Sequence, residues 1–273
     1  MSRGRATSDG SQAFRAGDAA PVTGRRPLWP SRLHLWPLVL ALSLLALLWF
    51  GPLPARAQGS FAAHMVMHMG VVAIAAPLLA IGLARLWPGL MAGIPAGLAL
   101  AASFAEFVVI WGWHAPALHD AARVEMPLFV AEQASFLLAG LFVWATALGT
   151  AEEGPRGKTG AGGDTSGLGA RAAGVAGLLM TSMHMTLLGA LLLFSPRPLY
   201  ACADLCSPAA SMTPLEDQAL GGVIMLVVGG AAYLTGGLVL LASVLRGPPG
   251  SAMPETAYAA DPFPPTTTGR DAP

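Results

Sequence analysis

Residues 61–83 read FAAHMVMHMGVVAIAAPLLAIGL, and this stretch decides the fold class. It contains no Asp, Glu, Lys or Arg over its whole length. A helix needs roughly 20 apolar residues to cross the hydrocarbon core of a bilayer. The stretch also lacks the period-2 alternation that membrane β-strands show. It therefore predicts a transmembrane α-helix.

Similar apolar runs occur on both sides of this stretch. The composition agrees, because 54% of the chain is hydrophobic and only 11% is charged, whereas soluble domains carry roughly 25% charged residues. The sequence thus predicts an all-α, polytopic transmembrane helical bundle of about six spans. The predicted spans are residues 33–50, 61–83, 90–113, 127–148, 172–194 and 219–245.

Polar tails flank this transmembrane domain, which covers residues 33–246. Residues 1–32 are rich in Arg, Gly and Ser, and residues 247–273 are rich in Pro and Thr. Such compositions predict disordered termini. The net charge is zero, so nothing indicates nucleic-acid binding; the expected surroundings of the domain are membrane lipid.

Lysine and arginine are unevenly distributed among the segments that connect the spans. With six spans and a cytoplasmic N-terminus, all but three of the 15 Lys and Arg residues lie in cytoplasmic segments. The three exceptions are Arg56, Arg123 and Arg197. Cytoplasmic segments of membrane proteins carry an excess of these residues. We therefore expect a multi-pass protein whose N-terminal and C-terminal tails are both cytoplasmic.

The first apolar run leaves two interpretations open. It follows an Arg-rich segment, and Ala55-Arg56-Ala57 matches the A-x-A pattern of a signal-peptide cleavage site. The leading segment is longer than that of a typical signal peptide, which favours an uncleaved anchor. In both cases Gln58 emerges on the outer side of the membrane.

The second span begins with HMVMHM at residues 64–69. His64 and His68 are four residues apart, so they share one face of a helix and can converge on one ion or cofactor. Ionisable groups inside a membrane are costly and usually functional. Met65 and Met69 are candidate further ligands, because thioether sulfur suits Cu(I) and imidazole also binds copper. Methionine also fills gaps in ordinary apolar cores.

The fifth span repeats this composition in MTSMHM, residues 180–185, where Met180 and His184 are again four residues apart. Under the predicted topology, His184 and His114 lie toward the outer side, like the histidines of the second span. A lone histidine near the interface, such as His119, is more commonly solvated or hydrogen-bonded. We therefore expect an outer copper site built from the histidines and methionines of the second, third and fifth spans.

Acidic residues and cysteines allow more than one role. Glu106 and Glu132 lie within apolar spans. They could hydrogen-bond to the metal-binding histidines or form part of a proton path. The alternative is that they are neutral carboxyl groups hydrogen-bonded between helices. Asp217 is explained most simply by attraction of a carboxylate to a helix N-terminus. Cys202 and Cys206 lie in a predicted outer loop, where a disulfide is expected and copper binding is the alternative.

Several longer blocks resemble the multi-span CtaG family of cytochrome c oxidase assembly factors. They occur in the family's order and cover roughly residues 51–246. The blocks are HMVMHM followed by AAPLLAIG (residues 75–82), WHAPALHDAA (residues 113–122), HMTLLGALLLFSPRPLY (residues 184–200) and PLEDQALGG (residues 214–222).

The resemblance implies a helical protein of the bacterial plasma membrane that is required for building the oxidase at a copper-related step. Its implied partners are oxidase subunits or copper chaperones. His64, His68, His114 and His184 match the family's recurring histidines. One departure is Gln133, which follows Glu132 where family members often have a histidine.

The function expected from these observations is that of an assembly factor, not an enzyme, which holds or relays copper near the outer membrane face. No nucleophile–base motif or nucleotide-binding loop is evident in the sequence. One alternative is a membrane cytochrome that binds haem b through histidines on two helices. A copper transport or resistance protein is another.

Overall fold

The structure is a computed structural model that describes residues 35–87, 89, 91, 94–152, 163–200 and 212–246. Every regular element in these ranges is a helix, which confirms the predicted all-α class. The two predicted tails lie outside the described residues, and so do Cys202 and Cys206.

In the part of the chain that the structure describes, five helical segments are long and apolar enough to cross a membrane, and a bent helix pair makes a sixth when it is counted as one span. This agrees with the predicted number of about six. The bent pair consists of α1 (Trp36–Phe50) and α2 (Leu53–Gly59), which meet at 49°. The five spans are Phe61–Leu86, Ala96–Trp113, Met126–Thr150, Leu168–Phe194 and Pro214–Leu245.

Two of the spans contain a π-helical segment. The first span after the bent pair runs through α3 (Phe61–Met69), η2 (Gly70–Ala75) and α4 (Ala76–Leu86), and the last runs through α9 (Pro214–Ile224), η4 (Met225–Gly229) and α10 (Gly230–Leu245). The other helices are uninterrupted. They are α5 (Ala96–Trp113), α6 (Pro116–Val124), α7 (Met126–Glu152) and α8 (Gly163–Phe194).

Local chemistry explains where these helices begin. The helix α5 begins after Pro95, whose extended backbone forms the N-cap, so it starts later than the predicted residue 90. The helix α9 begins earlier than the predicted residue 219, because Thr213 and Glu216 form a capping box before it. The short helix α6 starts at Pro116, a residue suited to the first turn of a helix.

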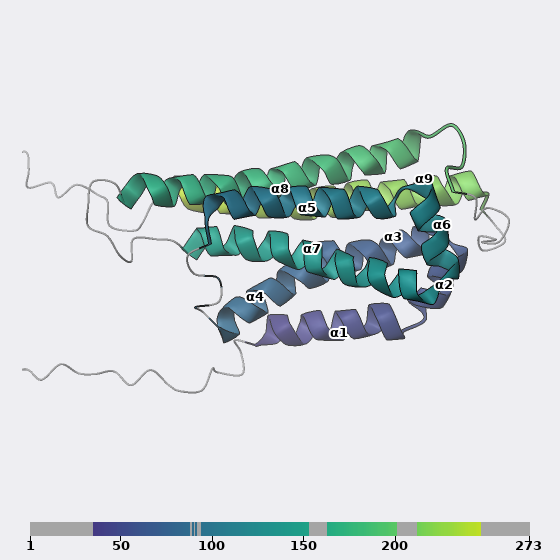
Figure 1. The fold of residues 1–273 in the computed structure, drawn as a ribbon, viewed down its shortest axis with the longest axis horizontal. Coiled ribbons are helices and arrows are strands. Elements are labelled where there is room, and N and C mark those ends of the chain that lie inside the picture. Colours follow the sequence, from purple (N-terminus) through teal and green to yellow (C-terminus); the bar gives the residue numbers. More distant parts are fainter. Residues whose placement is uncertain are drawn as a thin grey trace, which may run out of the picture.

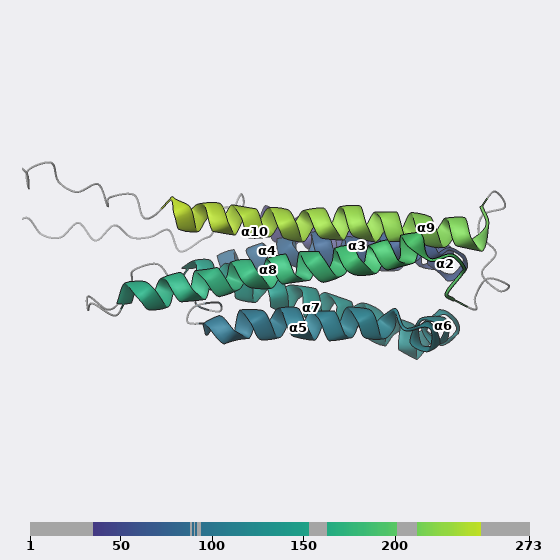
Figure 2. The ribbon, with the colours of Figure 1, turned by 90° about the horizontal axis from the view of Figure 1, so that it is seen from above.

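The helices lie side by side along one long axis (Figures 1 and 2). The helix α8 contacts α5, α7, α9 and α10, while α3 packs against α9 and α4 packs against α1 and α7. The short helices α2 and α6 lie at one end of the bundle, together with the start of α3 and of α9 (Figure 1). We call this the α6 end.

Glycine allows a close contact between two helices near the α6 end. A Cβ added to Gly222 of α9 would lie 2.7 Å from the backbone nitrogen of Leu193 and 2.8 Å from the carbonyl oxygen of Gly189, both in α8. The backbones of α8 and α9 therefore touch directly, which is the usual role of small residues between membrane helices.

Candidate metal site

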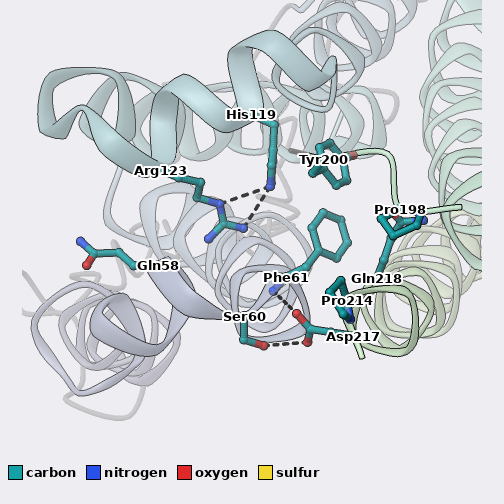
Figure 3. A pocket seen from close by; sticks show the side chains of 10 residues that line it. All are labelled: Gln58, Ser60, Phe61, His119, Arg123, Pro198, Tyr200, Pro214, Asp217 and Gln218. Carbon is teal, nitrogen blue, oxygen red and sulfur yellow. Dashed lines mark hydrogen bonds between the residues drawn. The ribbon is translucent and has the colours of Figure 1, made fainter. Parts of the chain in front are cut away.

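The start of α3 is held in place by a carboxylate from α9. Asp217 accepts hydrogen bonds from the backbone N–H of Phe61 at 2.5 Å and from the Ser60 hydroxyl at 2.8 Å (Figure 3). It also accepts one from the backbone N–H of Ala62 at 3.1 Å. Ser60 is itself the N-cap of α3 and accepts from the N–H of Ala63. The first turn of α3, which carries the first histidine, is therefore fixed against α9.

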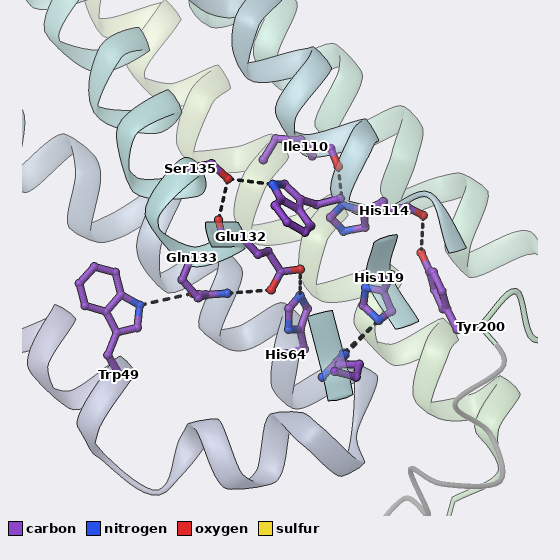
Figure 4. Close-up of polar contacts among 11 residues, drawn as sticks. Trp49, His64, Ile110, His114, His119, Glu132, Gln133, Ser135 and Tyr200 are labelled. Carbon is purple, nitrogen blue, oxygen red and sulfur yellow. Dashed lines mark hydrogen bonds and ion pairs between the residues drawn. The ribbon is translucent and has the colours of Figure 1, made fainter. Parts of the chain in front are cut away.

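His64 faces a carboxylate from α7. Its Nε2 lies 3.4 Å from Oε1 of Glu132, an ion-pair distance without hydrogen-bond geometry, and both side chains are buried. The other oxygen, Oε2, accepts a hydrogen bond from Nε2 of Gln133, whose Oε1 accepts from the Trp49 indole N–H of α1 (Figure 4). Gln133, the departure from the family pattern, thus orients Glu132 rather than offering a soft ligand.

A third group comes from α6. The ring of His119 packs edge-on against the ring of His64, with centroids 5.2 Å apart. Each of His64, His119 and Glu132 offers one possible ligand atom, and these three atoms lie within 4.8 Å of one another. Two atoms bound to one ion at about 2.1 Å are at most about 4.2 Å apart. If the side chains moved closer together by less than about 1 Å, all three ligand atoms could therefore bind one ion.

Arg123 is hydrogen-bonded to one ring nitrogen of His119 in this structure. The guanidinium Nε and Nη2 lie 3.2 Å and 3.1 Å from His119 Nε2. Arginine has donors only, so Nε2 accepts and the proton of the neutral ring is on Nδ1. Burial, reinforced by Arg123, holds the pKa of His119 well below its usual value. Burial also lowers the pKa of Arg123 to about 10, so at neutral pH the arginine stays charged beside a neutral imidazole.

A second pair of imidazoles lies next to this group. The rings of His68 in α3 and His114 at the end of α5 have centroids 5.5 Å apart. His114 Nδ1 lies 2.7 Å from the carbonyl oxygen of Ile110 in the preceding turn, and the hydroxyl of Tyr200 donates to the carbonyl oxygen of His114 (Figure 4). His68 packs on the ring of Phe136, 4.0 Å between centroids.

These four histidines are buried, yet each keeps at least one ring nitrogen without a hydrogen-bond partner among the described residues. The atoms are both nitrogens of His64 and of His68, Nε2 of His114 and Nδ1 of His119. Each buried donor or acceptor left unsatisfied costs about 1–3 kcal/mol. A bound cation would use the lone pairs on the unprotonated nitrogens of His64, His68 and His114, and it would take the lone pair of His119 Nε2 in place of Arg123. The donors therefore fit a transition-metal ion, since imidazole and carboxylate both bind copper and zinc.

The methionines predicted as ligands are used in packing. Met65 and Met69 are buried, but they lie on the α3 face that meets the last span. A Cβ added to Gly221 would be 2.9 Å from Cγ of Met65, and one added to Gly229 would be 3.0 Å from Sδ of Met69. Met180 in α8 is half-buried. The contacts described for Met65 and Met69 are thus with the last span, and their role as ligands stays a prediction.

His184 is also buried but lies elsewhere. Its ring packs edge-on against Phe107 of α5, with centroids 5.5 Å apart, and both ring nitrogens lack a hydrogen-bond partner among the described residues. It is not part of the group formed by His64, His119 and Glu132. The structure therefore brings His114 and His119 to the α3 pair, and it places His184 beside Phe107.

Glu106 is hydrogen-bonded between helices, one of the two roles expected of it. The Tyr233 hydroxyl of α10 donates to Oε1 of Glu106 at 2.5 Å and lies 3.2 Å from the carbonyl oxygen of Val72 in η2. The hydroxyls of Ser103 and Thr181 are hydrogen-bonded to each other at 2.8 Å. These contacts join α5, α8, α10 and the π-helical segment of the α3–α4 span.

Sequence reasoning missed His119 because that residue belongs to a short helix rather than to a span. Pro116 ends the continuity of α5, and α6 then turns His119 back toward α3. The motif WHAPALHDAA does contain the signal, since proline after alanine indicates a new helix start.

The space beside the site is small. A cavity of about 40 Å³ lies between Phe61, His119, Arg123 and Tyr200, with room for a few water molecules only (Figure 3). A larger cavity of about 700 Å³ is lined by α4, η2, α7, α8 and α10, including Trp144, and no histidine lines it. Of these two cavities, only the small one is lined by a histidine.

One family model matches most of the chain. The model is described as cytochrome c oxidase caa3 assembly factor (Caa3_CtaG), and it matches residues 17–247. All the histidines of the site and Glu132 lie inside this match. No curated protein and no solved structure matches the chain significantly.

Proposed function

Because this chain belongs to the cytochrome c oxidase caa3 assembly factor family, we propose that it serves assembly of the oxidase by holding a copper ion at His64, His119 and Glu132. The observation that carries the proposal is the convergence of these three side chains. They come from α3, α6 and α7, they are buried, and their ligand atoms lie within 4.8 Å of one another. Ionisable groups gathered inside a membrane protein usually bind something.

The donor set favours Cu(II) over a thioether-bound Cu(I). Two imidazoles and a carboxylate are harder ligands than the His and Met mixture expected from sequence. The methionines Met65 and Met69 support the packing of α3 instead. Among the divalent first-row ions, copper binds most tightly to nitrogen and oxygen sites. Copper is therefore the ion for which these ligands have the highest affinity.

In this proposal the ion is cargo, and the chain is not an enzyme. Its partners would be the oxidase subunits that receive copper or the chaperones that deliver it. The site lies at the α6 end, which also carries Arg56, Arg123 and Arg197, the only basic residues that the predicted topology puts outside. We place this end on the outer face of the plasma membrane, with the N-terminus in the cytoplasm.

The space in the bundle does not favour the haem alternative. Pockets for larger ligands measure roughly 300–1,000 Å³, whereas the cavity beside His119 measures about 40 Å³. The cavity of about 700 Å³ would offer haem no histidine as an axial ligand. The second alternative, copper transport, shares the same site and differs only in the fate of the ion.

The test is copper binding by the purified full-length protein in detergent or nanodiscs. We expect about one Cu(II) per chain and no Soret band. His64→Gln keeps most of the side-chain volume but is a poor copper ligand, so it should lower the affinity at least about tenfold. His184→Gln is the matched control, because His184 is also buried and lies outside the three-ligand group.

The cellular readout is the copper content and activity of the oxidase at normal levels of this protein. We expect His64→Gln to give assembled oxidase subunits with reduced copper, partly restored by added copper. Full copper loading in cells that contain stable His64→Gln protein would refute the proposal. A Soret band in the purified wild-type protein would favour haem instead.

A further inference from the structure

The second imidazole pair, His68 and His114, has the features of a ligand site in its own right. Both side chains are more than nine-tenths buried. Both nitrogens of His68 and Nε2 of His114 have no hydrogen-bond partner among the described residues. If the two histidines served only for packing, these buried nitrogens would stay without a hydrogen-bond partner, which has a large free-energy cost.

His114 is oriented as a metal ligand is. Its Nδ1 lies 2.7 Å from the carbonyl oxygen of Ile110, which can only accept, so Nδ1 carries the proton. The lone pair is then on Nε2. Metal-binding histidines usually donate their other N–H to a carbonyl or carboxylate in this way, which fixes the tautomer and the ring. The Phe136 ring, 4.0 Å from that of His68, restrains the second imidazole.

The spacing of the two rings matches one shared ion. An ion bound at an imidazole nitrogen lies roughly 3.2 Å from the ring centroid, given a bond of about 2.1 Å. Two imidazoles on one ion therefore have centroids at most about 6.4 Å apart. The observed 5.5 Å corresponds to a bent arrangement at that ion. The His64 and His119 rings, 5.2 Å apart, have nearly the same spacing.

We propose that His68 and His114 form a second copper station, one helical turn deeper in the bundle than the station of His64, His119 and Glu132. This inference rests on the proposed function and deepens it. The two stations are linked by α3, because His64 and His68 are four residues apart and so roughly 6 Å apart along the helix. Passage between them is ligand exchange without a change of oxidation state.

The charges indicate that the stations are occupied in turn. Two divalent ions at roughly 6 Å repel each other strongly in a medium of low dielectric constant. Among the described residues, the carboxylate that lies within reach of two imidazole ligands, Glu132, belongs to the first station. One ion therefore moves between two sets of ligands, which is an arrangement for relaying copper rather than for storing it.

The test measures copper binding at the second station after two ligands of the first station have been substituted. The probe is Cu(II) added to the full-length protein in nanodiscs, measured by binding isotherms and by electron paramagnetic resonance. The variant His119→Gln/Glu132→Gln should still bind one Cu(II), about 10- to 100-fold more weakly than the wild type, with imidazole nitrogens as ligands. Adding His68→Gln or His114→Gln to this variant should weaken the binding at least about tenfold further.

The outcomes separate this inference from the proposed function. The second station is refuted, and the first stands, if the wild type binds copper but the His119→Gln/Glu132→Gln variant binds none. The same conclusion follows if that variant binds copper equally well with and without His68 and His114. If the wild type binds no copper, both proposals fail. Should the double variant not fold, His119→Gln alone replaces it, because it keeps the Glu132 contacts with Gln133. His184→Gln in the same background is the control for loss of a buried histidine.

Discussion

Asp217 of α9 caps the N-terminus of α3, accepting hydrogen bonds from the backbone N–H of Phe61 at 2.5 Å and of Ala62 at 3.1 Å. The first N–H groups of a helix have no partner within the helix itself. A carboxylate there is favoured both by hydrogen bonding and by the helix dipole. This contact ties the last span to the helix that carries His64.

Removing this cap should destabilise the protein and loosen the site. We expect Asp217→Ala to lower the free energy of unfolding by about 2 kcal/mol, because charged hydrogen bonds to buried N–H groups are lost. Copper affinity should fall as well. Glu216→Ala is the control, since Glu216 is exposed and caps only its own helix. Equal losses of stability and copper binding in the two variants, measured by thermal unfolding and titration in detergent, would contradict this account.

Arg123 should weaken copper binding in the wild type. Its guanidinium contacts His119 Nε2 and places a positive charge next to the ion site. At an effective dielectric constant of about 20, a charge at such distances repels a divalent ion by several kcal/mol. We therefore expect Arg123→Gln to raise the affinity for Cu(II) at least about tenfold. Arg197→Gln, at an exposed position beyond α8, should leave it unchanged. Weaker binding by Arg123→Gln would show that the arginine chiefly orients His119.

Acid should destabilise the metal-free protein through His119. Its pKa is lowered in the folded state, first by burial and then by Arg123, while the unfolded value is about 6.5. As the pH falls below about 6.5, the unfolded state takes up a proton that the folded state does not, so stability is lost. The slope from this group approaches about 1.4 kcal/mol per pH unit. Denaturant unfolding of wild type and His119→Gln between pH 5 and 8 (roughly the range in which histidine titrates) should show a shallower slope for the variant.

The contact between α8 and α9 should tolerate no side chain. In Gly222→Ala the new methyl group would meet backbone atoms of Leu193 and Gly189, which cannot move aside separately. We expect a lower unfolding temperature and a loss of about 1–3 kcal/mol, as in other overpacked sites. Gly169→Ala in α8 is the control, because open space surrounds that position and alanine favours a helix over glycine. An unchanged unfolding temperature for Gly222→Ala would contradict direct contact between the backbones of α8 and α9.

The orientation of the bundle can be read from reporter fusions. We expect a reporter after Gly163, at the start of α8, to be active in the cytoplasm, and one at Pro208 to be active outside. The physical reason is the uneven distribution of Lys and Arg, which are retained on the cytoplasmic side. The opposite pattern would put the histidine stations on the inner face and would remove the argument for copper handling outside.

Much of the fold could be predicted from the apolar runs alone. Stretches such as residues 61–83 carry no Asp, Glu, Lys or Arg and are long enough to span a membrane. Backbone polar groups in lipid must be paired within the protein, and a helix pairs them within a single segment. That His64 and His68 share one face of a helix also followed from sequence, since residues four apart do so whatever surrounds the helix. These properties depend on the composition and period of one segment. The group of ligand atoms around His64, however, contains His119 and Glu132 rather than His68.

The composition of the site depended on the tertiary structure. His119 joins His64 because α6 turns back after Pro116, and Glu132 joins them because α7 presents it to α3. Met65 and Met69, only one residue from the two histidines, instead face the glycines of the last span. The spacing of two residues in the sequence determines whether their side chains share a face of a helix. The rotation of each helix and its choice of neighbour are set by packing between helices, through contacts such as Asp217 with Phe61, and this decided which polar groups meet.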